Sequence, residues 1–123
     1  MNVALWILQV LLGAFFLFHS FTILRPNPAR LQRGMKYVLE MPSGLRVFAG
    51  VAEGLAGVAL IVAPLIHPVA WLAPLAALGL VVLMIGAAVF HLPRHEYPNI
   101  GLNAVLGLLA AVIAWGRFGP YQF

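Results

Sequence analysis

The chain has no cysteine among its 123 residues. It therefore cannot form a disulfide bond, offer a thiolate nucleophile or supply a Cys ligand to zinc or to an iron–sulfur cluster. Charged residues are also scarce, at 8% of the chain, whereas an ordinary soluble domain has about 25%. Hydrophobic residues make up 63%. This composition excludes a water-soluble globular domain and predicts an integral membrane protein.

Four long apolar runs occupy most of the sequence, at about residues 3–24, 45–66, 69–92 and 100–118. Each has roughly the 20 residues that a helix needs to cross a bilayer, and none alternates in polarity like a barrel strand. We therefore expect an all-α integral membrane protein, an antiparallel bundle of four transmembrane helices forming a single domain over residues 1–123. No room remains for a soluble catalytic domain, so we expect an accessory protein and not an enzyme on its own.

The connections between the runs are mostly short and carry turn residues. His67 and Pro68 predict a tight turn that makes the second and third helices antiparallel neighbours. Ser43 and Asn99 are candidate N-caps for the second and fourth helices.

The one long connection, residues 25–44, carries the pattern of a short amphipathic helix. Its apolar residues recur at helical spacing and oppose a mostly basic face. The pattern predicts an interfacial helix at about residues 28–40, either a lipid anchor or a docking surface for a membrane-protein partner. The apolar face consists of Leu31, Met35, Val38 and Leu39, and the charged face of Arg30, Arg33, Lys36 and Glu40.

The distribution of charge predicts the orientation. The formal net charge is +4, and the cations lie beside apolar runs, where they can contact anionic lipid head groups. We therefore expect membrane lipids as partners and no nucleic acid. By the positive-inside rule, the first and third connections face the cytoplasm and both termini face the outside. Arg25, Arg30, Arg33, Lys36, Arg46 and Arg94 flank the cytoplasmic side, and only Arg117 lies toward the other side.

Four polar residues fall inside the apolar runs, all in their cytoplasmic half. At 1.5 Å per residue from the cytoplasmic boundary, Glu53 lies about 12 Å deep, His19 about 7 Å, Asn103 about 5 Å and His91 about 3 Å. Each is on a different helix, so the count predicts one shared polar pocket that opens toward the cytoplasm. Arg94 follows in the next connection and either caps the mouth of this pocket or serves as a positive-inside anchor.

Glu53 is the most informative of these residues. An ionised carboxylate in hydrocarbon costs several kcal/mol, so we expect Glu53 to face the bundle interior, to be paired, or to be protonated. It is either a hydrogen-bonding group between helices, toward Asn103 or His91, or a carboxylate that binds a proton or a ligand. Small residues at helical spacing predict helix packing surfaces. They are Gly50, Gly54 and Gly57 on the second helix and Gly79, Gly86 and Ala87 on the third.

Metal and haem sites find little support in the sequence. His19 and His91 are close in depth, but no second histidine pair accompanies them, so haem is not expected. A zinc site needs at least three ligands in suitable geometry, and the depths of His19, His91 and Glu53 are too different for one. Gln9, in the outer half of the first helix, lies too far from Glu53 to join the pocket and is expected to bridge to a neighbouring helix or subunit.

Several segments share a pattern of glycine, alanine and polar residues. They are residues 45–57 (LRVFAGVAEGLAG), 74–79 (PLAALG), 86–94 (GAAVFHLPR) and 114–118 (AWGRF), together with Asn103. The pattern resembles the DoxX-like family of small bacterial four-helix membrane proteins over nearly the whole chain. The resemblance implies a multi-pass protein of the bacterial inner membrane.

Members of that family typically carry a Glu in helix two, a His and an Arg at the end of helix three and an Asn near the start of helix four. These positions fall on Glu53, His91, Arg94 and Asn103. Members often place a Lys near the end of helix one, where this chain has His19, so the resemblance implies that His19 replaces that Lys beside Glu53. Relatives in the wider group are linked with thiosulfate:quinone oxidoreduction and with complexes that join oxidative-stress enzymes.

Two functions from different classes remain open. In the first, the chain is an accessory subunit of a membrane redox complex, and a pocket of Glu53, His91, Asn103, His19 and Arg94 binds a quinone-like or lipid ligand. In the second, it is a structural or assembly protein whose polar cluster only holds the helices together. Either function allows a membrane-protein partner or a homo-oligomer.

Overall fold

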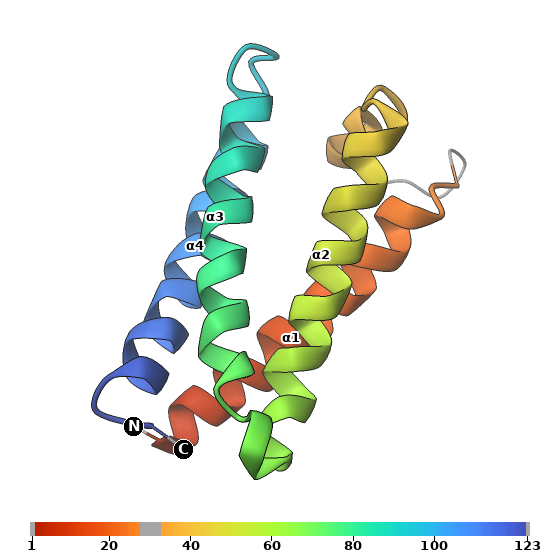
Figure 1. Cartoon of the computed structure of the whole chain (residues 1–123). Helices are drawn as coiled ribbons and strands as arrows, with labels where there is room; N and C mark the ends of the chain where they lie inside the picture. The colour runs from red at the N-terminus through yellow and green to blue at the C-terminus, as the bar shows by residue number, and fades with distance from the viewer. Residues whose placement is uncertain (1, 28–32, 123) are drawn as a thin grey trace.

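The computed structural model describes residues 2–27 and 33–122, and the regular structure within these ranges is entirely helical (Figure 1). The long helices are α1 (Asn2–Leu24), α2 (Ser43–Val62), α3 (Leu72–His91) and α4 (Tyr97–Phe118). Each belongs to a segment long and apolar enough to cross a membrane. The expected class, an all-α protein with four transmembrane helices, is confirmed.

The predicted N-caps of two helices are wrong. α2 begins at Ser43 itself, with Pro42 at the N-cap position and no side-chain cap bond. α4 begins at Tyr97 after Glu96, which places Asn99 inside the helix. The proline in the first turn of α4 permits this earlier start, because its missing N–H has no partner there in any case.

The turn between α2 and α3 is tight, as the sequence predicts. Two short 3-10 helices, η2 (Ala63–Leu65) and η3 (His67–Val69), form it. Each has a proline in its first turn, where a backbone donor is not needed. α2 and α3 are therefore antiparallel neighbours (Figure 1).

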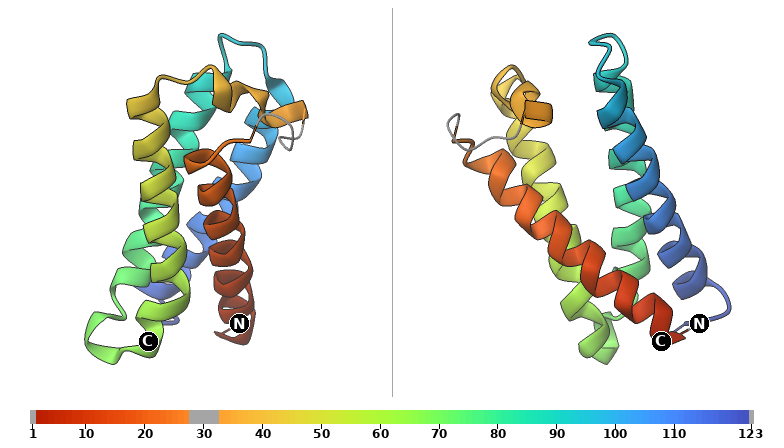
Figure 2. Two further views of the ribbon diagram at one scale, coloured as in Figure 1. Left: turned by 90° about the vertical axis from the view of Figure 1, so that its right-hand side faces the viewer. Right: turned by 180° about the vertical axis from the view of Figure 1, so that it is seen from behind.

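The four helices are arranged as two hairpins. α1 packs mainly against α2 and α3 mainly against α4, and the contacts between the hairpins are less extensive. The hairpins meet at the end where both termini lie and diverge toward the opposite end (Figures 1 and 2). The first and third connections share that diverging end.

Glycine permits the close approach of α1 and α2. A Cβ on Gly57 would lie 2.7 Å from the backbone oxygen of Gly13, closer than real Cβ atoms approach other atoms. A Cβ on Gly54 would lie 2.8 Å from the hydroxyl oxygen of Ser20, and one on Gly50 would collide with another α1 side chain. The expected packing surface on this face of α2 is therefore confirmed, and α1 is the helix that packs there.

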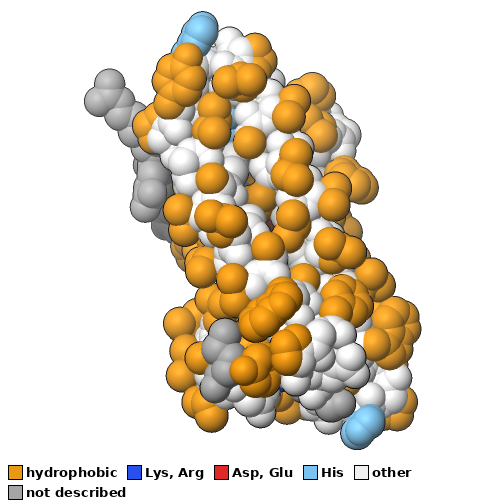
Figure 3. All heavy atoms as spheres, turned by 90° about the vertical axis from the view of Figure 1, so that its left-hand side faces the viewer, with side chains coloured by type: hydrophobic (Ala, Val, Ile, Leu, Met, Phe, Trp, Pro, Cys, Tyr) orange, Lys and Arg blue, Asp and Glu red, His pale blue; other side chains and the backbone are white. Residues whose placement is uncertain are grey.

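One buried apolar cluster joins all four helices, with Phe16, Leu60, Leu80 and Ile113 among its most buried members. Many other large hydrophobic side chains face outward. Figure 3 shows hydrophobic atoms spread over the face that includes α4. Soluble proteins rarely expose so continuous an apolar surface, whereas the hydrocarbon of a bilayer covers it without cost.

The long first connection contains the 3-10 helix η1 (Arg33–Leu39). Residues 28–32 of the expected amphipathic segment, which include Arg30 and Leu31, lie outside the described residues. The described part of the predicted interfacial helix at about 28–40 is a 3-10 helix, whose turns are tighter than those of an α-helix.

η1 packs onto the other hairpin. The side chain of Val38 is buried at 1% exposure. The ring of Tyr37 meets the ring of His91 edge-on, with the centroids 4.4 Å apart. Through Tyr37, η1 therefore contacts α3 and is not merely a segment lying on the membrane. Figure 2 shows η1 at the end where the hairpins diverge.

Candidate functional site

A cavity of about 810 Å³ lies between the two hairpins. Pockets that hold a drug-sized ligand have volumes of about 300–1,000 Å³. All four helices and the first connection contribute to its lining. We refer to this space as the interhairpin cavity.

Small residues on α2 and α3 create the space. A Cβ on Gly79 or Gly86 would meet no atom within 4 Å. We expected these glycines and Ala87 to pack against another helix, but the structure places them on the cavity wall. Their small size leaves room for a guest molecule. The wall on α2 is built in the same way, from Ala49, Ala52, Ala56 and Ala59.

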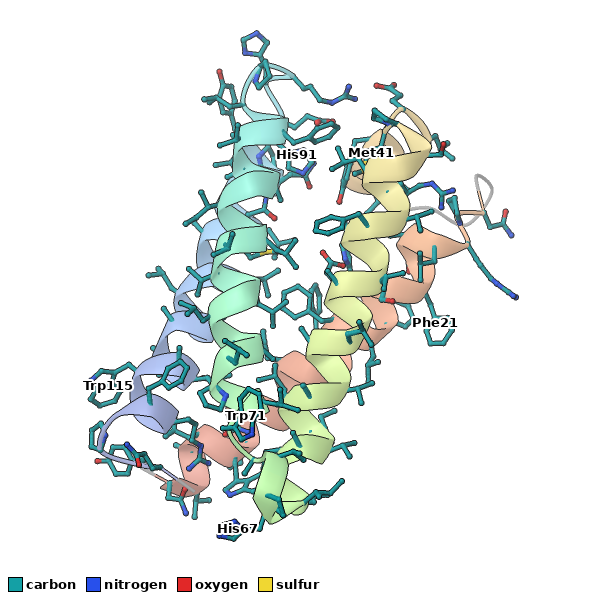
Figure 4. All side chains as sticks on the ribbon, viewed as in Figure 1. Phe21, Met41, His67, Trp71, His91 and Trp115 are labelled. Carbon is teal, nitrogen blue, oxygen red and sulfur yellow. The ribbon has the colours of Figure 1, made fainter. Side chains whose placement is uncertain are left out.

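The cavity is long and its polarity is uneven. On α3 the lining extends from Leu72 to His91, a rise of about 28 Å at 1.5 Å per residue. The part near Leu72 is apolar. Figure 4 shows two lining residues at the other end, His91 and Met41, on the two hairpins that border the cavity. This other end, which we call the polar end, contains His19, Tyr37, Glu53, His91, Asn99 and Asn103.

At the polar end, Glu53 on α2 is hydrogen-bonded to His19 on α1. Nδ1 of His19 lies 2.7 Å from Oε2 of Glu53, whose side chain is 6% exposed. The structure thus pairs Glu53 with His19, as the family resemblance implies, and not with Asn103 or His91. Because the carboxylate occupies Nδ1, the nitrogen of His19 left for a ligand is Nε2.

A second imidazole–carboxylate pair lies on the other hairpin. Nδ1 of His91 lies 2.9 Å from Oε1 of Glu96, and Nε of Arg94 donates a 2.7 Å hydrogen bond to the same oxygen. Arg94 also forms an ion pair with Glu40, just after η1. Since His19 and His91 both line the cavity, each hairpin contributes one carboxylate-bound imidazole to the polar end.

Arg94 is part of a charge network and does not line the cavity. Hydrogen bonds to Glu40 and Glu96 raise the pKa of Arg94. Burial acts to raise the pKa of Glu96, but its hydrogen bonds with His91 and Arg94 outweigh burial and hold that pKa below its ordinary value. The guanidinium also lies 5.3 Å from the ring centre of Phe90. Arg94 therefore links the α3–α4 turn to the connection that carries η1.

Arg46 is engaged as well. Its Nη1 donates hydrogen bonds to the backbone oxygens of Ile23 and Leu24, at 2.7 and 3.1 Å. These oxygens belong to the last turn of α1 and have no partner within that helix. Arg46 thus caps the C-terminal end of α1 and makes no direct pair with Glu53.

Asn103 on α4 is buried with an unused donor. It is 9% exposed, and it lines both the interhairpin cavity and a smaller apolar groove between α3 and α4. Its Nδ2 donates to no atom of the described residues. A buried donor without an acceptor costs about 1–3 kcal/mol, so a ligand oxygen at this position would recover that free energy.

Tyr37 is a lining residue that the sequence did not reveal. Depth counting selects residues within apolar runs, and Tyr37 lies in a connection. Burial, followed by the charges of Glu53 and Glu96, raises its pKa to about 12. Its hydroxyl therefore remains protonated at neutral pH and can donate a hydrogen bond.

A second polar cluster lies where the hairpins meet. Arg117 on α4 is 3% exposed. Its Nε donates a 2.6 Å hydrogen bond to Oε1 of Gln9, and its Nη1 donates to Oδ1 of Asn2 and to the backbone oxygen of Tyr121. Gln9 in turn donates to the backbone oxygen of Leu60. The expected bridge from Gln9 to a neighbouring helix is confirmed, and the cluster joins α1, α2 and α4.

Comparison with known proteins agrees with this architecture. No curated protein and no solved structure matches the chain significantly. The sequence model of the DoxX-like family matches residues 7–113, a range that includes every residue of the polar end. Together with the four helices that can span a membrane, this match shows that the chain is a multi-pass membrane protein and belongs to the DoxX-like family.

Proposed function

We propose that this DoxX-like protein binds one amphipathic molecule, a quinone-like or lipid ligand, in the interhairpin cavity. The observation that carries the proposal is the polarity of the cavity, whose polar residues gather at one end of a mostly apolar space. An amphipathic molecule in a bilayer has the same polarity, with its head near the interface and its chain in the hydrocarbon. The cavity therefore matches such a molecule in its membrane orientation.

A neutral head group with carbonyl oxygens suits the polar end best. Nδ2 of Asn103 needs an acceptor, and His19 and His91 each keep Nε2 for a ligand. A phosphate head group favours arginine partners, but Arg46 and Arg94 are engaged with backbone oxygens and with glutamates. We therefore favour a quinone-like ligand over a phospholipid.

The proposal makes the protein an accessory subunit in or beside a membrane redox complex. The chain has no cysteine, so thiol chemistry belongs to a partner protein. This chain binds the quinone-like ligand, and the partner protein exchanges electrons with that ligand. We place the protein in the bacterial inner membrane with the polar end toward the cytoplasm and both termini outside, because basic residues flank the polar end.

Native mass spectrometry of the protein, extracted gently from its own membrane, tests ligand and partner together. We expect the wild type to retain a quinone and the Asn103→Leu variant to lose most of it. Gly86→Leu narrows the cavity without changing a polar group and should also reduce retention. Tyr97→Phe serves as the control, since Tyr97 is exposed and does not line the cavity.

A bare bundle, or one bound only to another protein, would contradict the binding proposal. That result would favour the second function, a structural or assembly role. The pair of His19 and Glu53 supports this alternative, because it joins α1 to α2 whether or not a ligand is present. Loss of bundle stability in Glu53→Gln with no ligand to lose is the expected result in that case.

A further inference from the structure

Tyr37 differs from the other polar lining residues in the element that carries it. Among the described residues, it is the one tyrosine that lines the interhairpin cavity. It belongs to η1 and not to a transmembrane helix. Its position therefore depends on how the first connection is held at the diverging end of the hairpins.

Ring contacts hold Tyr37 against the α3–α4 hairpin. Its ring meets His91 edge-on at 4.4 Å, at an interplanar angle of 88°, and lies 6.1 Å from the ring of Phe90. The adjacent Val38 is buried. The ring of Tyr37 is thus packed against α3. The same residue also lines the polar end of the cavity.

An ion pair holds the same connection in place at Glu40, three residues after Tyr37. Glu40 pairs with Arg94 of the α3–α4 turn, and Nε of Arg94 donates to Glu96 at 2.7 Å. The connection with Glu40 belongs to one hairpin and the turn with Arg94 to the other. This ion pair therefore joins the two hairpins across the end where they diverge (Figure 1).

The surroundings of the Tyr37 hydroxyl favour a donor role. Burial first, and then the charges of Glu53 and Glu96 on the two hairpins, raise the pKa of Tyr37. Each of these carboxylates is hydrogen-bonded to an imidazole. A negatively charged environment disfavours the phenolate. The hydroxyl therefore stays protonated in a cavity that a second donor also lines, Nδ2 of Asn103, which has no acceptor among the described residues.

We propose that Tyr37 binds the polar head group of the ligand as a hydrogen-bond donor, and that the ion pair of Glu40 with Arg94 positions it there. The inference rests on the proposed function, because it assigns a further binding residue to the same cavity. Tyr37 is then a binding residue, and Glu40 and Arg94 are positioning residues. The first connection completes the polar end that the four helices leave open.

The first test measures binding of decylubiquinone, a quinone with a single decyl chain, to the full chain in phosphatidylcholine nanodiscs. Tyr37→Phe keeps the ring and removes only the hydroxyl. We expect its affinity to fall roughly three- to tenfold, the effect of one ordinary hydrogen bond. Affinity for decylbenzene, which has the chain but no oxygen, stays unchanged. Tyr97→Phe, the matched control, alters neither affinity.

The second test addresses the positioning residues. Glu40→Gln leaves the cavity lining intact and breaks the ion pair, and we expect roughly a 1.5- to fivefold loss of decylubiquinone affinity. In Glu40→Cys/Arg94→Cys, a flexible bis-maleimide replaces the ion pair with a covalent link, and the chain offers no other cysteine. Cross-linking should restore affinity, whereas labelling both sites with a mono-maleimide should not.

The outcomes separate this inference from the function on which it rests. If Asn103→Leu weakens decylubiquinone binding and Tyr37→Phe does not, Tyr37 is not a binding residue and the cavity proposal stands. An equal loss of decylbenzene binding in Tyr37→Phe would also overturn the inference, because it would reveal a packing defect. If the wild type binds no decylubiquinone above empty nanodiscs, both proposals fail.

Discussion

The bond between His19 and Glu53 gives the first prediction at the scale of single residues. Glu53→Gln and His19→Gln each break an interhelical contact, and we expect each to lower the free energy of unfolding by about 0.6–2 kcal/mol. The double variant should lose less than the sum of the two, because the residues share one interaction. Denaturation in mixed micelles measures the free energy of unfolding of the purified wild type, the two single variants and the double variant.

Additive losses of stability in the double variant would contradict an interaction between His19 and Glu53, since additivity is expected for residues that do not interact. Thr22→Val is a suitable control on α1. The hydroxyl of Thr22 bonds only to the backbone oxygen of Phe18 on its own helix. It should change stability little and show no coupling to Glu53.

Arg117 leads to a different prediction, because its cluster lies away from the cavity. Arg117→Met removes the donor that bonds Gln9, Asn2 and the backbone oxygen of Tyr121. Leaving such groups without a partner costs about 1–3 kcal/mol. We expect a lower thermal unfolding temperature with ligand retention per folded molecule unchanged. Selective loss of ligand at unchanged stability would show that this cluster belongs to the binding site.

The sequence predicted the depth of the polar residues along their helices better than it predicted their hydrogen-bond partners. Depth along a helix follows from residue number alone, so Glu53, His19, His91 and Asn103 were placed together. Hydrogen-bond partners also depend on helix rotation and on rotamers, which residue numbers do not contain. For that reason the pairing of His91 with Glu96 and the burial of Arg117 were not foreseen.

At the scale of helices, two sets of glycines should respond in opposite ways. Gly57→Ala places a Cβ 2.7 Å from a backbone oxygen of α1, and we expect a loss of about 1–3 kcal/mol in stability. Gly79→Ala meets no atom within 4 Å and should be neutral or stabilising by up to about 1 kcal/mol. Thermal unfolding of the two variants checks the contrast. Equal destabilisation would mean that α3 packs against another helix.

The α3–α4 turn should show a dependence of stability on pH. His91 and Arg94 face Glu96 and hold its pKa below the ordinary value of 4.5. A carboxyl group whose pKa is lowered by folding stabilises the fold above its unfolded value and loses that contribution as the pH falls through the folded value. Wild type should therefore unfold at a higher temperature than Glu96→Gln at pH 7.

That difference in unfolding temperature should shrink as the pH falls below 4.5, the ordinary carboxyl value. Arg94 remains charged throughout this range, because an arginine guanidinium loses its proton only far above pH 7. A difference that persists unchanged to the lowest measurable pH would show that Glu96 acts through packing and not through charge.

Hydropathy predicted the helices, but the ends and the first connection needed the structure. The membrane-spanning length of each apolar run determines that a helix forms. The exact starts differ by a few residues, with Pro42 at the N-cap of α2 and Pro98 in the first turn of α4. Amphipathic spacing predicted that η1 has a buried face. It did not indicate whether lipid or protein covers that face, since both are apolar, and Val38 proves to be buried by protein.

At the scale of the whole molecule, the orientation in the membrane is directly testable. Because the chain lacks cysteine, single cysteines report exposure without a background. We expect His67→Cys, in the exposed α2–α3 turn, to react with an impermeant maleimide in intact spheroplasts. His95→Cys, in the exposed α3–α4 turn, should react only after permeabilisation. The reverse pattern would invert the proposed topology.

The sequence predicted a bundle of four helices but not the divergence of its hairpins. Small residues were interpreted as contacts between helices, which is correct for Gly57 against Gly13. The same residue type lines empty space at Gly79 and Gly86. Composition cannot distinguish a surface that meets a helix from one that meets a ligand, because both require the absence of a side chain.

The two sets of glycines have a consequence for how such a protein can evolve. Substitutions at Gly13 or Gly57 reduce the stability of the fold, since the backbones of α1 and α2 lie close together there. A Cβ at Gly79 or Gly86 meets no atom within 4 Å, so substitutions there change the size of the cavity instead. Under the proposed function, single changes on α3 can therefore alter which molecule the cavity accepts, while the packing of α1 against α2 is kept.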